Sequence, residues 1–281
     1  MAERRALTFA CDGNWLYGVL DVPDVARHRG VLFVVGGPQY RAGSHRQFAL
    51  LARELAQEGC PAMRFDYRGM GDSEGEMRDF EQVDDDLRCA IDAFFDAVPE
   101  LTEVVLWGLC DAASAASLYA ASDARVSGLV LLNPWVRTEA GAAKATLKHY
   151  YRARLLDPGL WKKIVTGRFD YGAAVGSLRR LLGSATSKKQ APAAAAAAAA
   201  LPERMAASLG RFHGQVLVLL SGADLTAHEF SDLAQADPTW KNLLAAPRVT
   251  SKTLPKADHT FSRHSWHDQM AQWTREWVRS W

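Results

Sequence analysis

Residues 104–113 read Val-Val-Leu-Trp-Gly-Leu-Cys-Asp-Ala-Ala, and they predict a buried strand, a sharp turn and then a helix of small residues. The tip of the turn is Cys110, inside Gly108-Leu109-Cys110-Asp111-Ala112. Such a junction lifts one side chain above the sheet and aims it at the helix N-terminus. Cysteine is nucleophilic as the thiolate, and a helix N-terminus favours that form. A buried structural cysteine fits these five residues equally well, so the rest of the chain has to decide.

The composition describes a globular chain without a strong charge bias. Its 281 residues are 48% hydrophobic and carry a formal net charge of +1, which gives no argument for binding to nucleic acid. No segment is apolar enough for a secretion signal or a membrane span. Four cysteines, at positions 11, 60, 89 and 110, have no spacing typical of metal ligands or redox pairs. We therefore expect a cytoplasmic protein in a reducing compartment, with a free thiol at Cys110.

Strand and helix patterns alternate along most of the chain. Asp12-Gly13 predicts a hairpin turn between the first two strands, and Val31–Val35 is apolar throughout, as in a strand buried on both faces. Alternation of this kind predicts an α/β fold with a mostly parallel, eight-stranded sheet and helices on both faces. The expected strands lie near 5–11, 14–21, 31–35, 61–66, 103–107, 127–132, 216–220 and 248–254. The expected helices lie near 45–58, 80–97, 112–122, 226–236 and 263–281.

The alternation stops after Asn133-Pro134, and residues 135–211 predict helices without a clear strand. We interpret this segment as a helical cap inserted between two parts of one core, residues 1–134 and 212–281. From Arg137 to Arg211 it carries 14 Lys and Arg against 4 Asp and Glu. That surplus fits a solvated helix surface, or a surface that meets phosphates or an acidic carrier protein. Its alanine run, Ala193–Ala200, fits either a helix or a linker.

A cysteine nucleophile needs a base and an acid that orients the base. His259 follows the last expected strand and precedes the terminal helix, and imidazole exchanges protons near neutral pH. Asp224 follows the strand that ends near Leu220, where it can accept the other imidazole N–H or cap the next helix. The chain order nucleophile, acid, histidine is the order found in hydrolases with this turn. We therefore predict that Cys110, His259 and Asp224 act together.

Two backbone N–H groups are expected to stabilise the oxyanion of such a reaction. One belongs to Asp111, the residue after the nucleophile, and the other to the loop after the strand at 31–35. In that loop Pro38 has no N–H, so Gly37 is the first candidate and Gln39 the second. The side chain of Asp111 is unusual, because a carboxylate beside the thiol disfavours the thiolate. It could instead meet a hydrogen-bonding partner or contact the substrate.

These residues together resemble an α/β-hydrolase over nearly the whole chain. The resemblance is carried by the turn at Cys110, the loop Asp66-Tyr67-Arg68-Gly69-Met70-Gly71-Asp72-Ser73, and by Asp224 and His259. More narrowly, the chain resembles the first type of hydrolase associated with the exosortase A system, through 36–41, 65–72, 107–113 and 257–261. That resemblance implies the fold and a neighbourhood of exopolysaccharide and protein-sorting genes, and names no substrate. Cysteine replaces the usual serine, and Ala112 replaces the second glycine.

A thiol nucleophile favours particular acyl donors. Its acyl-enzyme is a thioester, which forms readily from another thioester and less readily from an oxygen ester. We therefore expect an acyl group on coenzyme A or on an acyl or peptidyl carrier protein, passed to water or to an acceptor. No cofactor or metal is expected, and the sequence does not indicate an oligomeric state. Two alternatives stay open: a non-catalytic binding protein with a degenerate turn, and a carboxylesterase or lactone hydrolase.

Overall fold

The computed structural model of the protein describes residues 3–37, 39–136 and 199–281. Their strands form one eight-stranded sheet in the order β1-β2-β4-β3-β5-β6-β7-β8. β2 runs antiparallel to β1 and β4, and all the other neighbouring pairs are parallel. The expected fold class is confirmed. The strands are β1 Glu3–Cys11, β2 Asn14–Val22, β3 Arg29–Val34, β4 Ala62–Asp66, β5 Glu103–Leu109, β6 Val126–Leu132, β7 Gln215–Ser221 and β8 Val249–Leu254.

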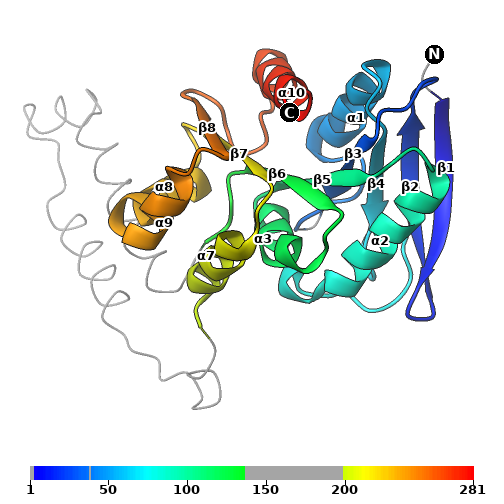
Figure 1. Ribbon diagram of the computed structural model, residues 1–281, viewed down its shortest axis with the longest axis horizontal. Helices are drawn as coiled ribbons and strands as arrows, with labels where there is room; N and C mark the ends of the chain where they lie inside the picture. Colours follow the sequence, from blue (N-terminus) through cyan, green and yellow to red (C-terminus); the bar gives the residue numbers. More distant parts are fainter. Residues whose placement is uncertain (1–2, 38, 137–198) are drawn as a thin grey trace, which may run out of the picture. The chain divides into compact units, whose positions relative to one another are not determined.

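Helices cover both faces of the sheet (Figure 1). α1 and α10 lie on one face, and α2, α3 and α7 lie on the other. A sheet covered on both sides buries its central strands, and every residue of β3 and β4 is buried, including the charged Arg29, Arg64 and Asp66. The helices are α1 Gln47–Gln57, α2 Asp84–Ala97, α3 Asp111–Tyr119, α7 Leu201–Arg211, α8 Leu225–Ala236, α9 Pro238–Leu244 and α10 His264–Val278. Short 3-10 turns occur at η1 Ser44–Arg46, η2 Phe80–Gln82 and η3 Ala120–Ser122.

Aromatic side chains fill the core beneath the candidate nucleophile. Trp107 of β5 is fully buried, and its ring lies 5.2 Å from the rings of both Phe33 and Phe48. Apolar residues of α10 complete the same cluster. Aromatic contacts of this kind stabilise the core by more than the burial of their apolar surface alone, so the strand that leads to Cys110 is packed against a rigid cluster.

Two helical segments differ from the sequence prediction. α9 was not expected; it is only seven residues long and begins at Pro238, and Asp237 caps it by accepting from the N–H groups of Thr239 and Trp240. α7 was assigned to the inserted cap. The chain separates into two compact units, 1–135 with 204–281 and 136–203, so most of α7 belongs to the first. Residues 137–198 lie outside the described residues, and the expected helical cap and most of the alanine run lie among them.

The cysteines bear on the expectation of a reducing compartment. Cys11 at the end of β1 and Cys89 in α2 form a disulfide, with 5.8 Å between their Cα atoms. They lie 78 residues apart, so sequence spacing gave no sign of the pair. Cys60 and Cys110 are free, as expected for Cys110. Disulfides are typical of proteins in oxidising compartments, so the cysteine spacing no longer supports a reducing compartment for this protein.

Candidate active site

Cys110 occupies the one-residue turn between β5 and α3. Its backbone has φ 63° and ψ −123°, a conformation that non-glycine residues rarely adopt. The turn is fixed on both sides: the N–H of Cys110 donates to the carbonyl of Leu132 at 2.8 Å, and its carbonyl accepts from Trp135 at 3.2 Å. The side chain is half-buried. The strained junction expected from the sequence is therefore present, and it presents the thiol beyond the end of the sheet.

Small residues make this turn possible. A Cβ atom on Gly108 would lie 2.6 Å from the backbone carbon and oxygen of Ala112, so only glycine lets the strand and helix approach so closely. Ala112 is buried, and the replacement of glycine by alanine at this position is accommodated. The Gly108 and Ala112 pattern thus reflects the packing of α3 on β5.

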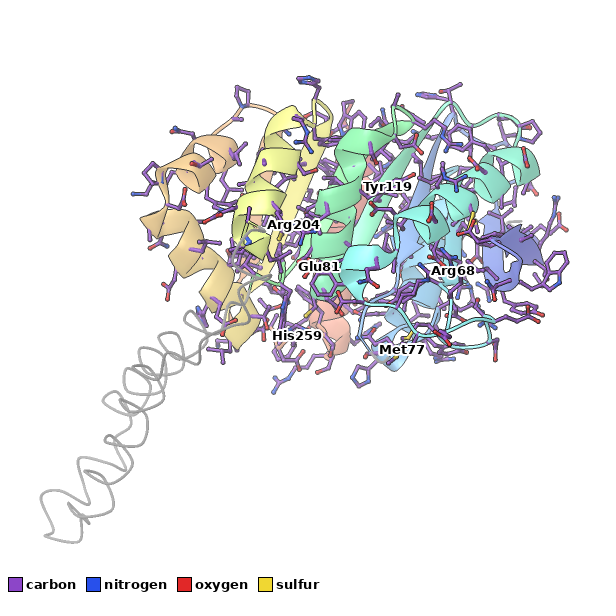
Figure 2. All side chains as sticks on the ribbon, turned by 90° about the horizontal axis from the view of Figure 1, so that it is seen from below. Arg68, Met77, Glu81, Tyr119, Arg204 and His259 are labelled. Atoms are coloured by element: carbon purple, nitrogen blue, oxygen red, sulfur yellow. A yellow bond between two sulfur atoms is a disulfide. The ribbon has the colours of Figure 1, made fainter. Side chains whose placement is uncertain are left out.

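His259 and Asp224 meet at the same edge of the sheet. Asp224 directly precedes α8, and His259 lies in the loop between β8 and α10. His259 Nδ1 lies 2.9 Å from Asp224 Oδ2, and the same oxygen accepts from the N–H of Ala227 at 3.1 Å. The carboxylate therefore orients the imidazole and caps α8 at once, so both sequence interpretations of Asp224 apply. Figure 2 places His259 toward one edge of the molecule and Tyr119, the last residue of α3, nearer the opposite edge.

The charges in this group support one another. The hydrogen bond that Asp224 accepts from the imidazole, followed by the interaction with Cys110, raises the pKa of His259 to about 10 from an ordinary 6.5. Burial opposes this change but does not cancel it. Burial alone would raise the pKa of Asp224, yet His259 outweighs burial and holds it below its ordinary value. The structure thus brings together a thiol, an imidazole and a carboxylate in an arrangement that favours a charged imidazolium.

Asn133 is a component of the site that sequence reasoning missed. It follows β6 and is fully buried. Its amide nitrogen donates to the hydroxyl of Ser221 at 2.9 Å and to the carbonyl of His259 at 3.0 Å, and its oxygen accepts from the N–H of Ser221 at 2.8 Å. Its φ of 44° is tolerated by asparagine better than by most residues. The pair Asn133-Pro134 at the end of a buried strand was the available signal.

The expected oxyanion donors have partners of their own. The N–H of Gly37 donates to Asp111 Oδ2 at 2.7 Å, and the N–H of Ala112 donates to Asp111 Oδ1 at 3.0 Å. The N–H of Gln39 donates back to the carbonyl of Gly36 at 3.4 Å. Gly37 and Asp111 therefore lie together, with the Asp111 carboxylate between the glycine loop and the start of α3. Gln39 faces its own turn.

An ion pair connects two of the elements on the face of the sheet that carries α3. η2 is linked to α7 by an ion pair between Glu81 and Arg204, which Figure 2 shows near the middle of the molecule. Among the described residues, no group of three or more His, Cys, Asp or Glu could hold a metal ion. Within those same ranges, none of the helices has the length and apolar character that a bilayer crossing requires.

Comparison with known proteins agrees with this architecture. The family model described as "Alpha/beta hydrolase family" matches residues 31–276. An esterase of Pyrococcus furiosus has a TM-score of 0.67 at 15% identity, over 100% of this chain and 93% of that one. A lidless serine hydrolase of Xanthomonas campestris has a TM-score of 0.58 at 19% identity, over 99% and 97%. Est1E of Butyrivibrio proteoclasticus, with ferulic acid bound, has a TM-score of 0.62 at 16% identity, over 97% and 98%. No curated protein matches the chain.

Proposed function

The chain belongs to the alpha/beta hydrolase family and is a hydrolase, and on this basis we propose that it transfers acyl groups through Cys110. His259 is the base and Asp224 the residue that orients it. The observation that carries the proposal is the convergence of the strained turn at Cys110 with the His259–Asp224 pair. The interaction with Cys110 that helps to raise the pKa of the His259 imidazole supports it.

The reaction follows from these groups. His259 takes the thiol proton before the substrate reacts and holds it as the imidazolium, and the Cys110 Sγ thiolate then adds to the acyl carbonyl carbon, which forms the C–S bond. The leaving group departs with the proton that His259 returns, and the acyl group stays on Cys110 as a thioester. Water, an amine or a thiol then attacks that thioester, with His259 again as the base. The sulfur nucleophile favours donors that are themselves thioesters, such as acyl groups on coenzyme A or on a carrier protein.

Intact-mass spectrometry over a panel of acyl-coenzyme A donors tests this proposal. We expect the mass to rise by one acyl group, and no such rise in Cys110→Ala. Cys60→Ser is the matched control, because Cys60 is the other free cysteine and burial raises the pKa of its thiol to about 12. A variant at that position should acylate like the parent. Acylation that persists in Cys110→Ala would contradict the proposal.

Iodoacetamide separates the enzyme from the alternatives. We expect Cys110 to alkylate much faster than Cys60 in the oxidised protein. Uniformly slow alkylation would favour a non-catalytic binding protein, and the hydrogen bond from Gly37 to the Asp111 carboxylate is the observation that gives this alternative weight. Fast turnover of oxygen esters with none of thioesters would favour a carboxylesterase or lactone hydrolase. The narrower likeness to exosortase-associated hydrolases stays a prediction.

A further inference from the structure

The Asp111 carboxylate lies against a loop far from it in sequence. Its two oxygens accept from the N–H of Gly37 at 2.7 Å and from that of Ala112 at 3.0 Å, and Gly37 lies 74 positions away. The N–H of Asp111 itself also stabilises the charged form of this carboxyl group. A carboxylate that only capped α3 would need no partner outside the helix. Asp111 therefore joins the tip of the β5–α3 turn to the loop after β3.

The loop is shaped around this carboxylate. A Cβ atom on Gly36 would lie 2.1 Å from Asp111 Oδ1 and 2.8 Å from the backbone nitrogen of Ala112. Gly37 has a φ of +55°, which lets its N–H turn inward. Only glycine at position 36 leaves space for the side chain of Asp111. Gly36 thus provides the space, and the N–H groups of Gly37 and Ala112 provide the donors, of a small anion site. In this structure the Asp111 carboxylate occupies that site.

Two of the donors around this carboxylate are those that acyl transfer at Cys110 would need. The N–H of Gly37 and the N–H of Asp111 are the expected donors to the oxygen of a tetrahedral intermediate. That oxygen and a carboxylate are both negative, so they cannot share two donors. We infer that Asp111 is an internal occupant of the oxyanion site, and that acyl transfer at Cys110 requires its carboxylate to be displaced or neutralised. This inference rests on the proposed function of Cys110.

The electrostatics around Asp111 make the occupant displaceable. Burial raises the pKa of the Asp111 carboxyl above its ordinary value, against the N–H groups that lower it, and the charge of Asp79 raises it further. Burial, followed by the charge of Asp111, raises the pKa of the Tyr67 phenol. The carboxylate is thus held by hydrogen bonds but opposed by burial and by a neighbouring negative charge. A substrate oxygen therefore competes with a carboxylate whose binding to these N–H groups is weakened by burial and by the charge of Asp79.

The reaction then has a defined order. The Asp111 side chain first rotates away, or takes a proton from solvent and no longer competes as an anion. The substrate carbonyl oxygen next accepts from the N–H groups of Gly37 and Asp111. Cys110 Sγ, whose proton His259 already holds, adds to the carbonyl carbon, and the electron pair of the C=O bond moves onto the oxygen. When the intermediate collapses, the C=O bond re-forms and the leaving group departs with the proton that His259 returns. Asp111 can return to the site once the acyl group has left Cys110.

The test uses a probe that needs the oxyanion site but no turnover. A small trifluoromethyl ketone adds reversibly to a cysteine thiolate, and the resulting hemithioketal oxygen requires the same donors. Its bound fraction is measured by 19F NMR in the full-length protein, with iodoacetamide alkylation of Cys110 measured in parallel because alkylation needs no oxyanion site. We expect Asp111→Ala to raise adduct affinity about tenfold or more beyond any change in the alkylation rate.

Two further variants make the outcome specific. Asp111→Asn keeps the shape and an acceptor oxygen without the charge, so its adduct affinity should lie between those of the parent and Asp111→Ala. The charge of Asp79 opposes the Asp111 carboxylate and the adduct oxygen alike, so Asp79→Asn, which leaves the hydrogen bonds of Asp111 in place, should keep the affinity close to that of the parent. Unchanged or weaker adducts in both Asp111 variants, with Cys110 alkylation intact, would show that Asp111 only latches the loop and would overturn the inference. Failure of Cys110 to alkylate in the parent would instead overturn the proposed function.

Discussion

At the scale of single residues, Cys110 holds the least favourable backbone conformation of the site. A non-glycine residue with positive φ and extended ψ costs on the order of 1–3 kcal/mol. The surrounding contacts must supply that energy, and the buried strand β5 with the hydrogen bonds of Cys110 to Leu132 and Trp135 does so. The strain is useful because it places the sulfur beyond the sheet edge, next to the first turn of α3.

The raised pKa of His259 predicts how stability depends on pH. A group whose pKa is higher in the folded protein stabilises it fully below the unfolded value, here 6.5, and loses that effect as pH rises toward about 10. We expect the free energy of unfolding to fall more steeply with pH across this window in the parent than in His259→Gln. Urea unfolding at a series of pH values measures it. His264→Gln, at an exposed histidine of α10, should follow the parent, and parallel slopes for parent and His259→Gln would contradict the prediction.

Position along the chain was enough to predict His259 and Asp224, because parallel strands end at one edge and groups that follow them converge there. The orientation of Asp111 could not be predicted in this way. It depends on how closely the Gly36-Gly37 loop approaches α3, and that distance is set by the packing of the whole sheet. The sequence offered the glycines and the carboxylate but not their contact.

At the scale of elements, the sheet was predictable because its central strands are continuous apolar runs bounded by turn residues. Every strand expected from the sequence is present, and the hairpin at Asp12-Gly13 joins β1 to β2. α9 was missed because a helix of only seven residues, the first of them Pro238, is too short to show helical periodicity in the sequence. Its place is set by tertiary packing, in which Trp240 meets Phe230 of α8 with 5.3 Å between ring centres.

Asn133 connects the end of β7 to the loop that carries His259, so its removal should affect both stability and catalysis. Removing its side chain leaves the partners at Ser221 and His259 unsatisfied, which costs about 1–3 kcal/mol for each buried group. Asn133→Gly removes the hydrogen bonds yet suits the positive φ, so we expect a lower free energy of unfolding and a lower kcat/KM. Ser221→Ala loses one of these bonds and should lie between this variant and the parent. Full kcat/KM in Asn133→Gly would show that the anchor on His259 is dispensable.

At the scale of the whole molecule, two connections tie the N-terminal hairpin to α2. One is the disulfide between Cys11 and Cys89. The other is Arg68, which is buried and pairs with Asp86 of α2 at 2.9 Å and with Asp12 of the hairpin turn at 2.7 Å. Spacing rules for cysteine describe neighbours in sequence, so a pair 78 residues apart cannot be recognised from them. The hairpin is thereby fixed to the face that carries α2.

The disulfide predicts a large effect on stability and a small one on the site. Cross-linking residues this far apart restricts the unfolded chain, so the Cys11→Ser/Cys89→Ser double variant should lose about 2–4 kcal/mol of unfolding free energy. Denaturant unfolding of the oxidised parent and the double variant measures it. We expect Cys110 alkylation at equal rates in both, since neither residue belongs to the site. Equal stability of the two proteins would mean that the cross-link is not formed in solution.

The Cys11–Cys89 bond has a consequence for anyone who handles this protein. Cys110 is best preserved in strong reductant, and the same reductant opens the bond that fastens the hairpin. Purification in strong reductant therefore keeps the Cys110 thiol reduced but opens the Cys11–Cys89 disulfide, and purification without reductant does the reverse. A preparation made in a reducing host and one made in an oxidising host are two different samples, and rates measured on them should be compared only after the state of each sulfur atom has been counted.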